Sequence, residues 1–500
     1  MHKFVKIQYK VFISPKTGDT YIMQYISYNF LYFVAASVLL YYVLPPKIRK
    51  YGLLVSNIVF YAFSGIKNTA FLIGFALVTY AAALLVGRTD CKSKKALFAV
   101  YIVISAGTLT FIKFANYTLG AVSKIFSVPG VTLDVIYPLG VAFFTLQGIS
   151  YVADVCRGKY APDKNVINVM LFMTYFPIIV QGPISRYDAL SKDLTKEHRF
   201  DGRNFSFGLQ LLLWGLFKKL VIANRAASFV DQVFNNYQDY SGLVTVFATF
   251  LYSLQLYADF SGCVDICRGV SSLYGIPLMQ NFNFPYTAVS VKDFWARWHI
   301  SLSTWLKDYI YIPLGGNRKG KARKYLNITA VFLVSGLWHG VGLHYIVWGL
   351  YHGALQVAGD LLKPARKKAV DVLKMRRDRF SYRFGQQALT FCAVSYGWLI
   401  FRANGLRAAY DMTRSVFVKF FCVDQLRELF DTEDFRVLMV FTAIFIIVSL
   451  WQKRYSLREK LARQNLWFRW AVYIAALFAV IIYGVYGSGY NAGDFLYMQF

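Results

Sequence analysis

Long apolar runs separated by short polar loops divide most of the chain. A helix needs about 20 residues to cross the hydrocarbon core of a bilayer. Candidate runs lie at residues 25–44, 51–64, 69–86, 96–122, 136–155, 166–184, 205–223, 243–260, 326–338, 345–361, 388–401, 437–451 and 470–486. Because several are short or contain polar residues, the pattern predicts an all-α, polytopic membrane bundle of about eleven to thirteen transmembrane or re-entrant helices.

The organisation of the chain favours a single membrane domain over residues 1–500. No Ser/Gly-rich or Pro-rich linker and no internal repeat divides the sequence. The first run is long and aromatic, lies far from the N-terminus and lacks a small-residue cleavage site. It is therefore expected to stay as a membrane helix instead of acting as a signal peptide.

Composition supports lipid as the solvent of this chain. Hydrophobic residues make up 57% and charged residues only 16%, whereas soluble domains average about 25% charged residues. The mean hydropathy is +0.40. Aromatic residues reach 18%, which is enough for interfacial belts or for the lining of an internal cavity.

The net charge of +29 is distributed in short clusters between apolar runs, for example at 47–50, 88–95 and 157–164. This distribution follows the positive-inside rule and argues against nucleic acid as a partner. The basic loops are expected to be cytoplasmic. The acidic connection at 424–434 is then expected outside, together with the C-terminus.

Cysteine and histidine spacing gives no metal or disulfide pattern. The six cysteines are scattered and form no C-x-x-C pair, so we interpret them as small core residues. His344 and His352 follow His339 by five and thirteen positions. This spacing does not form the i, i+4 ligand pair of a zinc helix, and no metal site is predicted.

Residues 284–353 crowd polar, ionisable and aromatic side chains together. Within 291–312, apolar and aromatic residues recur mostly at three, four and seven positions: Trp295, Trp298, Trp305, Tyr309 and Ile312. Charged side chains lie between them, so the pattern predicts an amphipathic helix near a membrane interface. Pro313 and the pair at 315–316 are expected to end it.

A basic turn follows this predicted helix. It contains Arg318, Lys319, Lys321, Arg323 and Lys324. Such a turn has the charge to hold the phosphates of a nucleotide-bearing donor such as coenzyme A. A cytoplasmic loop that obeys the positive-inside rule has the same composition.

Two histidines are candidates for chemistry. His339 ends the apolar run VFLVSGLWHG, where an ionisable group is costly unless it faces a cavity or a partner. It has the chemistry of a general base for an acceptor hydroxyl, although a structural histidine at a helix end would show the same pattern. His299, within RWHIS, is equally compatible with an interfacial position.

Carboxylates also occur inside apolar runs. Asp259 and Asp265 lie in QLYADFSGCVD and Asp154 in SYVADVCRG. Asp259 must face the bundle interior, and we favour a structural role, paired with Arg268 or Arg297, over a catalytic one. No serine elbow, Walker loop or G-x-G-x-x-G fingerprint is present in a strand-to-helix context.

Four stretches resemble the membrane-bound O-acyltransferase family, and in particular its bacterial alginate O-acetyltransferase branch. They are YPLGVAFFTLQGISYVADVCRG, YFPIIVQGPISRY, QLYADFSGCVDICRGVSSLYGI and the block from Phe284 to Gly353. The family-like core extends over about 25–404, with additional C-terminal helices at 405–500. Gln181 and Cys263 depart from the common alginate pattern.

The resemblance implies that His339 is the catalytic histidine and His299 a second histidine at the same central tunnel. Further candidates for the tunnel lining are Trp298, Trp338, Asp308, Tyr309, Arg297, Asp259 and Ser335. The donor is expected to be cytoplasmic acetyl-CoA, whose phosphates would lie near Arg318, Lys319 and Arg323, and no resident cofactor is expected. The acceptor is expected to be an extracellular polysaccharide, modified with the help of an extracytoplasmic partner transferase, and the location the bacterial cytoplasmic membrane.

Other functions remain open at this point. D-alanyl transfer to teichoic acid and peptidoglycan O-acetylation are alternatives within the same family, although the continuation YIPLGGNR at 311–318 favours acetyl transfer. A multispan polymer transporter would be expected to show inverted repeats, which the sequence lacks. A non-catalytic scaffold would tolerate replacement of His339.

Overall fold

The computed structural model describes residues 23–127, 130 and 132–486, and every regular element in this part of the chain is a helix. Six helices in it are long and apolar enough to cross a membrane. They are α3 (Ile66–Arg88), α4 (Cys91–Phe126), the continuous helix of α9 (Gly202–Leu216), η2 (Phe217–Ala223) and α10 (Asn224–Asn235), α11 (Gly242–Leu273), α20 (Glu433–Gln452) and α22 (Leu466–Tyr483). The expected all-α, multi-pass architecture is confirmed.

These six helices are fewer than the eleven to thirteen expected from the sequence. The other predicted runs lie in helices that contain more polar residues, that are interrupted or that are too short. Three predicted runs lie in helices of sufficient length that carry more polar side chains: α14 (Gly320–His339), α15 (Leu343–Leu361) and α17 (Phe380–Arg402). The run at 166–184 is divided into α6 (Val166–Thr174) and α7 (Phe176–Ile179), with Pro177 near the start of the second helix. Proline starts a helix readily but cannot continue one.

The remaining elements are short. They are α1 (Tyr28–Val43), η1 (Pro46–Ile48), α2 (Arg49–Ala62), α5 (Val141–Cys156), α8 (Tyr187–Thr195), η3 (Tyr237–Asp239), η4 (Pro285–Thr287), α16 (Lys363–Val372), α18 (Leu406–Val418), α19 (Val423–Phe430) and α21 (Leu457–Ala462). Of these, α1 and α5 are apolar but shorter than a full span.

The amphipathic helix predicted over 291–312 is not continuous. It consists of α12 (Val291–Arg297), α13 (Ile300–Leu306) and the π-helix η5 (Lys307–Tyr311). The break falls at His299, whose φ of +45° is left-handed and unusual for a residue other than glycine. Trp298 and Trp305 on these helices are buried inside the protein.

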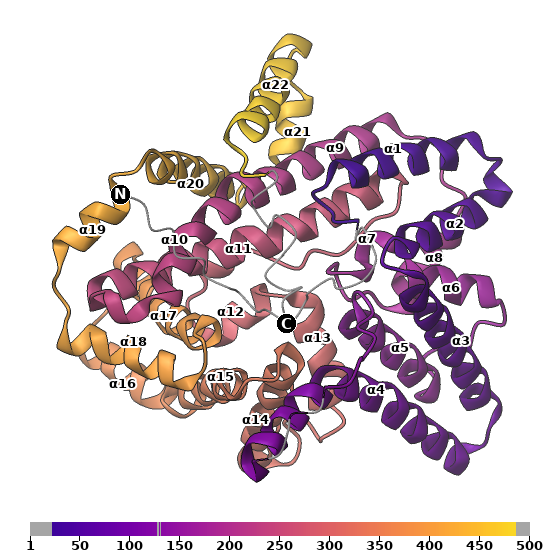
Figure 1. Cartoon of the computed structure of the whole chain (residues 1–500), viewed down its shortest axis with the longest axis horizontal. Coiled ribbons are helices and arrows are strands. Elements are labelled where there is room, and N and C mark those ends of the chain that lie inside the picture. Colours follow the sequence, from indigo (N-terminus) through magenta and orange to yellow (C-terminus); the bar gives the residue numbers. More distant parts are fainter. Residues whose placement is uncertain (1–22, 128–129, 131, 487–500) are drawn as a thin grey trace.

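These broken helices occupy the middle of the molecule (Figure 1). The N-terminal helices α1 to α8 gather on one side and α15 to α19 on the other, while α9 to α11 cross between them and α12 and α13 lie at the centre (Figure 1). The predicted end of the tract is confirmed, because the helix stops at Tyr311 and a turn follows through the left-handed Gly315 and Gly316.

Two buried ion pairs join η2 to α11. Lys218 Nζ lies 2.6 Å from Asp265 Oδ2, and Lys219 pairs with Asp259. Asp259 is therefore paired, but its partner is a lysine and not Arg268 or Arg297 as expected. Arg268 instead bonds Asp265.

The C-terminal helices pack against the same π-helix. The backbone N–H of Val485 donates to the carbonyl of Leu220 at 2.9 Å, and Asn224 Nδ2 donates to the carbonyl of Val485 at 3.1 Å. Arg225 pairs with Asp434 at the start of α20. The expected extracytoplasmic position of the C-terminus concerns an end that lies outside the described residues.

Candidate active site

Two buried histidines lie against the ring of Trp338. His339 is the last residue of α14, and its ring centroid lies 4.9 Å from that of Trp338. His299, at the break between α12 and α13, lies 6.2 Å from the same indole. The two histidines are 3% and 1% exposed. The side chains of His299 and His339, forty positions apart in the sequence, are thus buried against the same indole ring.

Aromatic rings from other helices hold the two imidazoles. His339 packs edge-to-face on Trp348 of α15 at 5.1 Å and on Phe401 of α17 at 5.3 Å. His299 packs on Phe260 of α11 at 4.7 Å. Edge-to-face packing restricts ring orientation and keeps bulk water away from the imidazoles.

Close packing of α14 on α15 places His339. A Cβ atom on Gly336 would lie 2.3 Å from the carbonyl oxygen of Tyr345, and one on Gly349 would lie 2.3 Å from that of Phe332. Small residues at such positions let two membrane helices approach backbone to backbone. Ser335, a sequence candidate, is buried one turn before His339 on the same helix.

Lys113 is a polar residue at this site that the sequence analysis missed. It lies on α4, and its Nζ donates to the carbonyl oxygen of Trp338 at 2.6 Å. The same ammonium lies 5.8 Å from the centre of the Trp338 ring. A lone lysine within the apolar run 96–122 was the available signal, since intramembrane charges usually mark function or pairing.

Three other sequence candidates have contacts of their own in this part of the protein. Trp298 is buried and packs on Trp398 at 5.1 Å. Arg297 Nε donates to Asp293 at 2.7 Å within α12. Asp259, next to Phe260 on α11, is engaged by Lys219 as described above.

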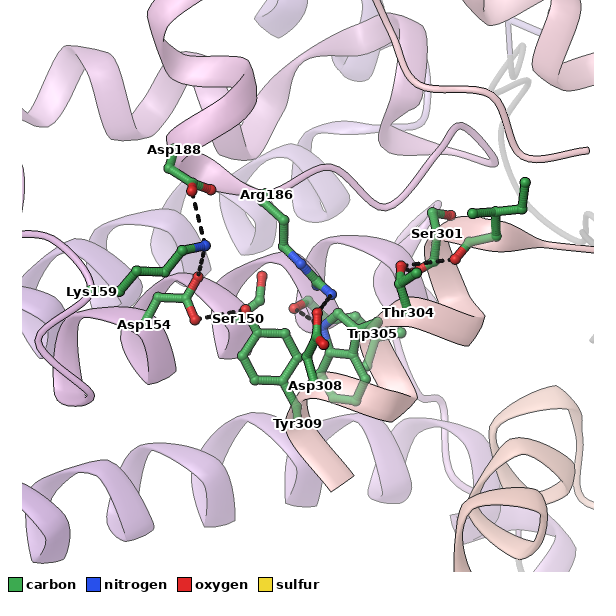
Figure 2. Close-up of polar contacts among 12 residues, drawn as sticks. Ser150, Asp154, Lys159, Arg186, Asp188, Ser301, Thr304, Trp305, Asp308 and Tyr309 are labelled. Carbon is green, nitrogen blue, oxygen red and sulfur yellow. Dashed lines mark hydrogen bonds and ion pairs between the residues drawn. The ribbon is translucent and has the colours of Figure 1, made fainter. Parts of the chain in front are cut away.

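Asp308 and Tyr309 belong to a second polar cluster, at the last turn of α5 (Figure 2). Tyr309 donates from its hydroxyl to Asp154 Oδ1 at 2.8 Å, and Arg186 pairs with Asp308 at 3.1 Å. Lys159 reaches Asp154 at 3.2 Å and Asp188 at 2.9 Å. Partial burial opposes the charge of Lys159, but its hydrogen bonds to the two carboxylates raise its pKa above the ordinary value.

The basic turn predicted for donor phosphates follows this second cluster directly. Arg318 and Lys319 are exposed in this turn, whereas Arg323 is exposed in the first turn of α14, which begins at Gly320. Arg323 Nε also donates to the carbonyl oxygen of Leu314 at 3.1 Å. The turn presents several cations to solvent beside the end of η5.

His352, the last histidine of the tract, has a packing role. His352 is fully buried on α15 and accepts from Trp295 Nε1 at 3.4 Å. Among the residues that the structure describes, no three His, Cys, Asp or Glu side chains gather in a way that would hold a metal ion. The polar groups at the Trp338 site include imidazole, indole and ammonium groups.

Comparisons with known proteins identify the family. Residues 98–401 match the model of the membrane-bound O-acyltransferase family. The probable alginate O-acetylase AlgI of Pseudomonas syringae is 34% identical over 385 residues, covering 76% of this chain and 72% of the relative. A peptidoglycan O-acetyltransferase of Helicobacter pylori is 32% identical over 437 residues, covering 81% and 80%.

A more distant relative is the teichoic acid D-alanyltransferase of Bacillus subtilis, 28% identical over 241 residues, which cover 46% of this chain and 60% of that protein. The family match spans more than half of the chain and includes His299, His339, Trp338 and Lys113. It also agrees with the six helices that are long and apolar enough to cross a membrane. This chain belongs to the membrane-bound O-acyltransferase family and is a multi-pass membrane acyltransferase.

Proposed function

We propose that this enzyme transfers an acetyl group from cytoplasmic acetyl-CoA to a hydroxyl group of an extracellular polysaccharide, or of a partner transferase that modifies the polysaccharide. Relatives named as alginate and peptidoglycan acetyl-transferring enzymes support this assignment. The observation that carries it is the packing of two buried histidines against one tryptophan. We further propose that the enzyme resides in the bacterial cytoplasmic membrane.

His339 is the proposed general base. Its imidazole takes the proton of the acceptor hydroxyl while the oxygen attacks the thioester carbonyl carbon. The new C–O bond forms, the C–S bond breaks, and the departing sulfur receives the proton. His299, on the same indole, is proposed to orient the reacting thioester.

Trp338 offers a hydrogen-bond donor at the same place. Its indole N–H is buried and has no partner among the described residues. A donor of this kind is suited to the carbonyl oxygen, on which negative charge develops during attack. Lys113, bonded to the backbone of Trp338, holds the end of α14 and adds a positive charge nearby.

The donor is proposed to enter from the side of the basic turn. Arg318, Lys319 and Arg323 present exposed cations there, and phosphate groups bind such cations. Loops at this end are expected to be cytoplasmic because they are basic. A site within the bilayer lets a cytoplasmic donor and an external acceptor meet without either crossing completely.

We also propose that the core at 25–404 and the C-terminal helices at 405–500 act as one unit. The contacts of Val485 with Leu220 and of Asp434 with Arg225 support this proposal. They connect the C-terminal helices to the middle of the chain.

Transfer of labelled acetyl from acetyl-CoA to cell-envelope polymer tests the function. Full-length protein is expressed with its neighbouring genes, as wild type, His339→Ala and the matched control His198→Ala. His198 lies in the loop before α9, where Nε2 contacts the carbonyl of Asp193. Loss of general-base catalysis costs about 10²–10⁴-fold in rate, so we expect label only in wild type and control.

The outcomes separate the parts of the proposal. Equal labelling by His339→Ala would refute the assigned base. Labelling from a carrier-bound D-alanyl thioester, with none from acetyl-CoA, would refute acetyl transfer and favour the chemistry named for the teichoic acid relative.

A further inference from the structure

Three neighbouring segments contain buried polar atoms that have no hydrogen-bond partner among the described residues. The atoms are Nε2 of Gln147, both amide atoms of Gln181, Oγ of Ser301 and Nη1 of Arg186. Gln147 is 2% exposed, and Gln181 and Ser301 are completely buried. Buried polar atoms in native proteins nearly always have partners, so this group needs an explanation.

The first segment is α5, which connects the histidine site to the polar cluster of Figure 2. Phe143 in its first turn packs on Trp338 at 5.6 Å, and Asp154 in its last turn accepts from Tyr309. Gln147 lies four positions after Phe143 and seven before Asp154, so all three share one helix face. The helix rises about 16 Å between Phe143 and Asp154, roughly half of the hydrocarbon thickness.

The second segment is the non-helical stretch 180–186, which runs beside α5. At one end, a Cβ atom on Gly140, directly before α5, would lie 3.1 Å from Val180 Cα. At the other end, the guanidinium of Arg186 lies 4.6 Å from the ring centre of Tyr309. Gln181 is therefore near the first turn of α5, and Arg186 is near its last turn.

The third segment is α13 with η5, which also contacts α5. Trp305 Nε1 donates to the carbonyl of Leu146 at 2.9 Å, and Tyr309 reaches Asp154. Ser301 precedes Trp305 by four positions and follows His299 by two. Figure 2 shows Ser301, Trp305 and Tyr309 along this helix, with Arg186 reaching toward it.

We propose that Gln147, Gln181 and Ser301 bind the pantetheine arm of the acyl donor, with Arg186 at the outer end. The arm carries two amide groups, and glutamine offers both a donor and an acceptor to each of them. The three segments lead from the basic turn to Trp338, where the thioester must arrive. This inference rests on the proposed function and assigns the residues that select the donor.

Coenzyme A and carrier proteins share this arm, so the recognised chemistry is pantetheine itself. The site is expected to accept the arm from either source, while the basic turn distinguishes the nucleotide. The test therefore uses acetyl-CoA, an acetylated carrier protein, S-acetylpantetheine, and S-acetyl mercaptoethanol, which lacks both amides.

Kinetics of full-length protein in lipid nanodiscs test the assignment with Gln181→Met and Gln147→Met. The control is Gln210→Met, a half-buried glutamine of α9 that bonds Tyr473 on α22. In both variants we expect kcat/KM to fall at least tenfold for every pantetheine-bearing donor that the wild type uses. A tenfold fall corresponds to about 1.4 kcal/mol of lost transition-state stabilisation. Most of this loss should be in KM. Activity with S-acetyl mercaptoethanol should not change, and the control should match wild type.

A binding measurement keeps the inference testable apart from turnover. Coenzyme A should raise the melting temperature of wild type and of Gln210→Met, because a ligand stabilises the state that binds it. It should raise that of Gln181→Met much less. Without ligand the variant should be as stable as wild type, since the replaced amide has no partner to lose.

Two results would overturn the assignment. The first is an equal loss of kcat/KM with all four thioesters, which would indicate a structural role or bound water. The second is an unchanged response of Gln181→Met to coenzyme A. Failure of the wild type to use any thioester would instead refute the proposed function.

Discussion

Replacing Lys219 by methionine should destabilise the protein severely. The Lys219 and Asp259 side chains are 4% and 1% exposed, so the variant leaves a carboxylate buried without its cation. Breaking a buried pair in this way costs about 3–5 kcal/mol. Replacing both residues, as Lys219→Met with Asp259→Leu, removes the charge together with its partner. The double variant is expected to recover most of the loss, because buried pairs and apolar replacements of similar volume are often nearly equal in stability.

The assay is the fraction of detergent-solubilised protein that remains monodisperse after heating. Arg436→Gln is the control, since its pair with Asp431 lies at the surface with both side chains more than half exposed. Surface pairs contribute little to stability. We expect the monodisperse fraction of the control to equal that of wild type. The fraction of the double variant should be lower, and that of Lys219→Met the lowest. A double variant as unstable as Lys219→Met would refute the reasoning, because the cost would then come from lost packing and not from an uncompensated charge.

Two further predictions concern α5 and the loop after it. Gly140→Ala should lower both melting temperature and acetyl transfer, because φ is +73° and the new Cβ would lie 2.0 Å from the carbonyl oxygen of Ile179; a variant as stable and active as wild type would contradict this. For Asp163, partial burial opposes ionisation, but hydrogen bonds from Tyr187, Asn168 and a backbone N–H lower its pKa. Its stabilisation is therefore present above the unfolded pKa of about 3.9 and is lost as pH falls through the lower folded value. Melting temperatures of Asp163→Asn should fall less than those of wild type on acidification, and parallel curves would contradict the assignment.

Features set by local sequence were predicted well. Apolar runs became helices, and the helix before the basic turn ended at Tyr311, as Pro313 and the glycines required. His339 was found because a charged or polar residue at the end of an apolar run is rare for energetic reasons. Its role, like that of His299, stays a prediction for the transfer assay.

The break at His299 was beyond a periodicity argument. One left-handed residue changes the direction of a helix while the apolar spacing on either side continues almost unaltered. The tract 291–312 therefore kept an amphipathic pattern although tryptophans on it are enclosed by protein. An aromatic side chain suits a membrane interface and a protein core equally well, so composition does not separate these environments.

Long-range pairing was also invisible in the sequence. Lys219 is forty positions from Asp259, and nearby arginines were equally reasonable partners. In the sequence, Gln181 stood out only as a departure from a family pattern. That its amide has no hydrogen-bond partner among the described residues follows from how three segments, distant in the sequence, pack together. Signals of this kind are carried by tertiary structure alone.

The hydrogen bond between Val485 and Leu220 has a consequence for synthesis of the chain. The neighbouring bond from Asn224 to Val485 spans 261 positions. At about 5–20 residues per second, the ribosome needs roughly 13–50 s to reach the second partner. Lipid tails provide no hydrogen bonds to the waiting groups of η2 during this time. Newly inserted molecules should therefore pass through an incompletely closed state that lasts until Val485 has been made and has reached η2.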